Sequence, residues 1–79
     1  MMKLKWIKVE KGMNIYAAET ARYRFIMVAP PRAQAALTVY HLEAAPDDEP
    51  IAERMCRTRR GAERYAQRFA NKPNEKRLV

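Results

Sequence analysis

The sequence is poor in the residues that reinforce small proteins with covalent or metal bonds. It has 79 residues and a single cysteine, Cys56, so no disulfide can form within the chain. The lone His41 and Cys56 also fall short of the paired ligands that a structural zinc site needs. A domain of this size buries only about 60–65% of its unfolded surface. We therefore expect stability to come from the chain's own core, with a homodimer contact as a further source.

Other features that define large functional classes are missing as well. The longest apolar run, residues 25–29, stops at Pro30 and is too short to cross a membrane. Two glycines cannot build a glycine-rich phosphate loop. One unpaired thiol and no signal peptide predict a reducing, cytoplasmic setting. No catalytic residue, metal ligand or cofactor site is predicted, so we expect a binding protein and not an enzyme.

Charge is abundant, and it is segregated along the chain. The formal net charge is +7. Residues 1–32 carry seven basic and two acidic side chains, residues 33–53 carry none and five, and residues 54–79 carry nine and two. Basic surfaces attract polyanions, so this distribution favours nucleic acid as a partner, although a highly charged solvated surface would look the same.

Alternation of apolar and polar residues predicts strands through the first two-thirds of the chain. The expected strands span residues 3–10, 13–19, 23–29 and 37–44, with a turn at Lys11–Gly12. The clearest is 23–29, in which Tyr23, Phe25 and Met27 point to one side. Residues 51–57 fit either a fifth strand or the start of a long helix, and we favour the strand.

The last third of the chain predicts one amphipathic helix. Ala62, Tyr65, Ala66 and Phe69 recur at helical spacing between Arg59 and Asn71, and Thr58 is a suitable N-cap. The fold class is therefore α+β, a small antiparallel sheet of three to five strands packed against one C-terminal helix. We expect a single domain over residues 1–72 and a frayed basic tail over 73–79.

The helix carries the first candidate site. Arg60, Arg64 and Arg68 stand four residues apart, Arg57 lies just before the helix, and Lys72 follows it. Like charges at this spacing repel, and a bound anion would relieve that repulsion. Guanidinium groups also match phosphate in a bidentate way. The alternative is an ordinary polar outer face of a helix.

The strands carry the second candidate site. If Tyr23, Phe25 and Met27 face the helix, Arg22 and Arg24 lie on the opposite face of the sheet, where Lys3 and Lys5 can join them. Such a face could lie in a DNA groove. The same face also carries Ile26 and Val28. Either these two residues mark a dimer contact, or the faces are assigned wrongly.

The segment Met55–Ala66, which reads MCRTRRGAERYA, adds a family resemblance. It resembles the closing pattern of strand, threonine, alanine and helix in the arm-site DNA-binding domains of tyrosine recombinases, which are similar to plant ethylene-response DNA-binding domains. That resemblance spans residues 13–70 and implies a sheet that enters the major groove. Lys5, Arg22 and Arg24 would then face the groove, and the helix arginines would contact phosphates. Gly61 departs from the pattern, which usually has a helix-favouring residue there.

These observations lead to two functional hypotheses. The first is a small, basic, non-catalytic nucleic-acid-binding protein of phage or mobile-element type, with DNA favoured over RNA. The second is a protein-interaction module, such as a phage-encoded inhibitor or accessory protein that binds an acidic host protein surface. The first predicts binding that weakens steeply with salt, and the second predicts a more apolar contact.

Overall fold

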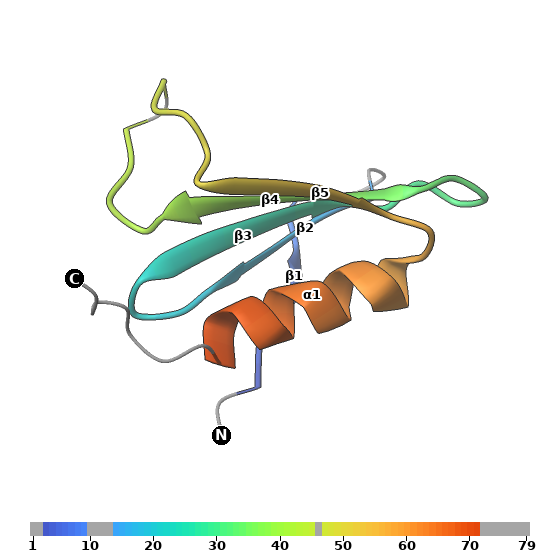
Figure 1. The fold of residues 1–79 in the computed structure, drawn as a ribbon. Helices are drawn as coiled ribbons and strands as arrows, with labels where there is room; N and C mark the ends of the chain where they lie inside the picture. Colours follow the sequence, from blue (N-terminus) through green and yellow to red (C-terminus); the bar gives the residue numbers. More distant parts are fainter. Residues whose placement is uncertain (1–2, 10–13, 46, 72–79) are drawn as a thin grey trace.

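The computed structural model describes residues 3–9, 14–45 and 47–71. These residues form one antiparallel sheet in the order β1-β2-β3-β4-β5, with helix α1 packed on one side of it (Figure 1). The elements are β1 Ile7–Lys8, β2 Ile15–Glu19, β3 Tyr23–Val28, β4 Ala35–His41, β5 Ala52–Cys56 and α1 Arg59–Asn71. The α+β class predicted from the sequence is confirmed.

The core lies between the sheet and α1. The central pair of strands sets its register, since Phe25 pairs with Val39 and Met27 with Leu37. All four side chains are at most 1% exposed, as expected where alternate residues of both strands point to the helix. The helix contributes small residues here, and its fully buried Ala62 and Ala66 allow its backbone to lie close to the sheet.

Aromatic rings close the end of the core near the C-terminus of α1. The ring of Phe69 stands edge-on to Tyr23 at 5.0 Å and to Phe25 at 6.1 Å, measured between centroids. Trp6 adds a further edge contact with Phe25 at 6.4 Å. Such edge-to-face pairs stabilise beyond the area that they bury. The predicted inward orientation of Tyr23, Phe25 and Met27 is therefore confirmed.

The segment between β4 and α1 resolves the alternative left open by the sequence. Residues 52–56 form β5, paired antiparallel with β4, so the strand was the correct choice and the long helix was wrong. The helix then begins at Arg59, because the Thr58 hydroxyl accepts a hydrogen bond from the Gly61 amide at 3.0 Å. The first N–H groups of a helix have no acceptor within the helix, and the Thr58 hydroxyl serves as the acceptor for one of them. The predicted N-cap is confirmed.

The N-terminal segment differs from its prediction. We expected a strand over residues 3–10, but within the described residues 3–9 the strand β1 covers Ile7–Lys8, and Val9 adds one backbone hydrogen bond to β2. The preceding residues leave the sheet edge and run beside α1, where the Leu4 amide donates to Gln67 Oε1 at 2.9 Å. Leu4 gains burial by this route and is 8% exposed. Burial against the helix therefore outweighs a longer edge ladder.

The observed ranges of β4 and β2 also differ from the predicted ones. β4 spans Ala35–His41 instead of 37–44, because Ala35 pairs with Cys56 and is fully buried, and because the chain turns directly after His41. β2 is described from Ile15 onward. The expected turn at Lys11–Gly12, Lys72 and the tail 73–79 lie outside the described residues. Nothing in the described part of the chain forms a helix with the length and apolar character needed to cross a bilayer.

Candidate functional site

The outer face of α1 presents the arginine stripe, which we define as Arg60, Arg64 and Arg68. All three are exposed, on the side of the helix opposite the buried Ala62 and Ala66. Residues four apart in an α-helix rise by about 6 Å and nearly share an angular position. The structure therefore brings the three guanidinium groups into one row that faces away from the sheet.

The described carboxylates leave this row uncompensated. Glu63 is the acidic residue of α1, and its Oε2 accepts from Arg59 Nε at 2.8 Å. Arg59 also lies over the ring of Tyr16, with its Cζ 4.1 Å from the centroid. Among the residues that the structure describes, no ion pair engages Arg60, Arg64 or Arg68. Like charges at this spacing repel one another.

Lys3 adds a further basic side chain beside the arginine stripe. With the N-terminal segment beside α1, Lys3, Arg60 and Arg64 line one hollow of about 240 Å³, and Glu63, which is paired with Arg59, lines it too. Sequence reasoning placed Lys3 on the sheet face with Arg24, because it assumed that the first strand continued to Lys3. The alternation of Leu4 and Trp6 with lysines fits a strand as well as a segment beside the helix, so the sequence held no signal for this position.

A second basic group lies at the N-terminal end of α1. Arg32, Arg57 and Arg59 line a broad hollow of about 590 Å³ together with Pro30 and Pro31. Arg57 was predicted from the sequence, whereas Arg32 was not, since it comes from the loop between β3 and β4. Arg32 has a φ of 59°, a left-handed conformation that a non-glycine residue rarely adopts. We call this group the basic end of the sheet.

Arg24, the one predicted basic residue on a strand of the open side of the sheet, lies away from the helix stripe. Arg24 alternates with the buried Phe25, so it lies on the face of the sheet away from α1. Its Nε is 2.9 Å from Glu19 Oε2, which neutralises it locally. Arg22 is exposed in the turn between β2 and β3, and Lys5 is exposed ahead of β1. Arg24 and the arginine stripe therefore lie on opposite sides of the sheet.

The face of the sheet away from α1, here called the open face, is mainly apolar. The pairing register aligns Ile7, Ala17, Ile26, Thr38 and Glu53 in one row and Ile15, Val28, Ala36 and Met55 in the next. Ile7 is 62% exposed, Met55 59% and Val28 40%. Val9, 56% exposed, lies beside Ile15 through a backbone hydrogen bond of 2.8 Å. The two faces of β3 were therefore assigned correctly from the sequence, and Ile26 and Val28 are part of a larger apolar surface.

Acidic residues border one end of the open face. The loop after β4 carries Glu43, Asp47, Asp48 and Glu49, all exposed. It rises from the sheet on the side away from α1 (Figure 1), and its Ala44 and Ala45 line a hollow of about 260 Å³ with the open-face residues Arg24, Ile26 and Tyr40. Asp48 shapes this loop by accepting a hydrogen bond from the Ala45 amide at 2.8 Å. We call this loop the acidic end of the sheet.

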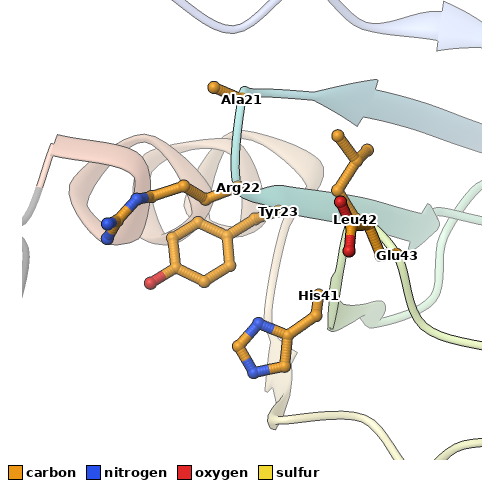
Figure 2. Close-up of a pocket in the computed structure, with 6 residues that line it drawn as sticks. All are labelled: Ala21, Arg22, Tyr23, His41, Leu42 and Glu43. Carbon is orange, nitrogen blue, oxygen red and sulfur yellow. The ribbon is translucent and has the colours of Figure 1, made fainter.

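A further hollow of about 430 Å³ lies beside the turn between β2 and β3, as Figure 2 shows. The rings of Tyr23 and His41 stack there at 6.1 Å, and Arg22, Leu42 and Glu43 complete the rim. Neither His41 nor the half-buried Cys56 has a described partner of the kind that activates a nucleophile or a base. Within the described residues, no group of three or more His, Cys, Asp or Glu side chains could hold a metal ion.

Comparisons with protein-family models, with curated proteins and with solved structures found no match to this chain. The two surfaces that bear on function are therefore the arginine stripe and the open face.

Proposed function

We propose that this protein binds nucleic acid, with duplex DNA as the first candidate, through the outer face of α1. The arginine stripe is the observation that carries the proposal. Its three guanidinium groups are exposed, aligned and without an ion-pair partner among the described residues, and Lys3 lies beside two of them. Phosphate oxygens match guanidinium donors in geometry and charge, and contacts of this kind supply affinity without sequence information.

The proposed contact differs from the one that the family resemblance implied. In that mode the sheet enters the major groove and presents Lys5, Arg22 and Arg24. The open face instead carries two apolar rows, and its Arg24 is paired with Glu19. Apolar side chains gain little from a phosphate backbone, whereas exposed arginines release counterions when they bind it. We therefore place the nucleic acid on the helix side.

Binding to a fluorescent 20-base-pair duplex and to a single strand of the same length tests this proposal. Measured at several salt concentrations, log affinity should fall steeply with log salt, by about 0.9 for each duplex phosphate contacted. Replacing Arg60, Arg64 and Arg68 by glutamine should weaken binding to all sequences alike and flatten that slope. Failure of the wild-type protein to retain either oligonucleotide at low salt would disprove the proposal.

A second candidate function is that of an accessory or inhibitor protein that docks on another protein. The apolar open face is the observation that favours it, since monomeric proteins rarely expose large contiguous apolar patches. A contact of this kind depends less on salt than phosphate binding does. One stoichiometric protein partner in a pull-down, with no nucleic acid in the eluate, would favour this function over the first.

A further inference from the structure

The geometry points to a second copy of this chain as the occupant of the open face. We infer that two copies pack face to face through their sheets, with their strands antiparallel, around a twofold axis that lies between the sheets and perpendicular to the strands. The acidic end of each copy then covers the basic end of the other. This inference does not depend on nucleic-acid binding, which uses the opposite side of the molecule.

The first support is the composition of the open face. Two of its three rows are mainly apolar. Its charged strand residues are Glu19 and Arg24, in the third row at the acidic end, and Glu53, on the edge strand β5. An apolar centre with a polar rim is the usual anatomy of a specific protein interface. When two such faces meet, the apolar side chains of both inner faces interdigitate, as in a β-sandwich.

The second support is the size of the face. Five strands at a spacing of about 4.8 Å and a rise of about 3.3 Å per residue make a surface of roughly 24 by 20 Å. Two such faces bury on the order of 1,000 Å² in total, which is the lower end of the range for specific interfaces. The raised acidic loop adds area beyond this. We therefore expect a dimer of moderate affinity that dissociates on dilution.

The third support is the arrangement of charge. A protein with a net charge of +7 repels its own copies, so self-association must keep the basic surfaces apart. In the face-to-face dimer both arginine stripes point outward, on opposite sides. The loop of the acidic end, with Glu43, Asp47, Asp48 and Glu49, contains no basic residue.

The opposite end of the strands supplies the complementary charge. Arg32 and Arg57 lie there, in loops that carry no acidic residue. An antiparallel arrangement brings each acidic end onto a basic end, and the twofold axis makes this contact twice. A parallel arrangement would instead place acidic on acidic and basic on basic. Charge therefore selects one orientation from those that the apolar face alone permits.

The first test is the mass of nuclease-treated, salt-washed protein by light scattering. At about 100 µM, a concentration suited to an interface of this size, we expect a mass of about 18 kDa, twice the 9.2 kDa of the chain, that falls on dilution. Val28→Glu adds one carboxylate to the apolar surface of each copy, so the interface would bury two unpaired charges. The dimer dissociation constant should therefore rise at least tenfold. Arg60→Gln, on the far side of the molecule, is the matched control and should leave the dimer intact.

A charge exchange tests the orientation. One variant carries Glu43→Lys, Asp47→Lys and Glu49→Lys, which makes the acidic end basic, and the other carries Arg32→Glu and Arg57→Glu. These five side chains are exposed, so circular dichroism should show both variants folded. Each variant alone has like charges at both ends and should be monomeric at a concentration where the wild type is dimeric. An equal mixture should form a dimer, because each end then meets its opposite.

Three results would overturn the inference. The first is a wild-type monomer at about 100 µM, which would leave the open face to a different protein. The second is a Val28→Glu variant, folded by circular dichroism, that dimerises as tightly as the wild type. The third is a mixture of the two charge variants that stays monomeric.

Discussion

Glu19 and Arg24 face each other across β2 and β3, where Arg24 Nε lies 2.9 Å from Glu19 Oε2. Their side chains are 54% and 41% exposed, so water screens the pair and its contribution to stability is small. Its larger effect is on the charge of the open face, because Glu19 neutralises Arg24, the one arginine on the strands of that face. The helix stripe has no equivalent among the described residues.

This contrast predicts different roles for Arg64 on the helix and Arg24 on the sheet. Arg64→Gln should weaken binding to a DNA duplex at low salt about three- to tenfold, because one charge-assisted phosphate contact is lost. Arg24→Gln should change that affinity less than twofold, since Arg24 lies on the opposite face and already has a partner. Fluorescence anisotropy at matched salt measures both. Equal losses in the two variants would show that net charge alone, and not the helix face, determines binding.

The N-cap of α1 predicts a loss of stability in Thr58→Ala. The Thr58 hydroxyl accepts from the Gly61 amide at 3.0 Å, and alanine leaves that donor without its side-chain acceptor. The expected cost is about 1 kcal/mol in the free energy of unfolding, measured by urea denaturation. Thr58→Ser keeps the hydroxyl and serves as the control, which should lie close to the wild type. A loss of similar size in both variants would assign the effect to the threonine methyl group.

Gly61 predicts a change of the opposite sign. It lies in the first turn of α1, and a Cβ added there would meet Thr58 Oγ1 at 3.4 Å and Cys56 Cβ at 3.6 Å, both ordinary contact distances. Gly61→Ala should therefore stabilise the protein by about 0.5–1 kcal/mol, because alanine loses less backbone entropy in a helix. Urea denaturation beside the wild type measures this gain. Destabilisation would mean that the turn between β5 and α1 is too tight for a methyl group.

The fold was predictable from the sequence where one periodicity dominated. The two-residue alternation of β3 placed Tyr23, Phe25 and Met27 on the helix side, and the four-residue spacing of α1 placed its arginines outside. Both patterns are local, so they survive without knowledge of the partner elements. The N-terminal segment was not predictable in this way, because Leu4 and Trp6 fit a strand equally well. The choice was made by a contact with Gln67, more than sixty residues away.

The candidate site was predictable to a similar degree. The arginine stripe follows from spacing alone, whereas the neutralisation of Arg24 depends on the register that pairs it with Glu19. The basic end required knowing that the loop containing Arg32 lies next to the start of α1, which is a property of the topology. Ile26 and Val28 did signal an apolar face in the sequence. Its extent through Ile7, Ile15 and Met55 became visible only when the five strands were aligned.

The contact between Leu4 and Gln67 predicts a coupled effect on the N-terminal segment. Gln67→Ala removes the acceptor of the Leu4 amide and leaves that partly buried donor without its side-chain partner, at a cost of about 1 kcal/mol. Trp6 is the only tryptophan and packs against Phe25, so its emission should shift to the red as the segment loosens. Lys3 would then leave its place beside Arg60 and Arg64, which should weaken DNA binding modestly.

The chain supplies a matched control for this effect. Gln67 Nε2 also donates to Asn71 Oδ1 at 3.1 Å, and Asn71→Ala removes that bond while keeping the acceptor of Leu4. Asn71→Ala should therefore leave the emission of Trp6 unchanged. If both variants shifted the emission equally, the position of the segment would depend on the last turn of α1 as a whole and not on the hydrogen bond between Leu4 and Gln67. A shift in Gln67→Ala alone would mean that one backbone hydrogen bond fixes the position of Lys3 beside the arginine stripe.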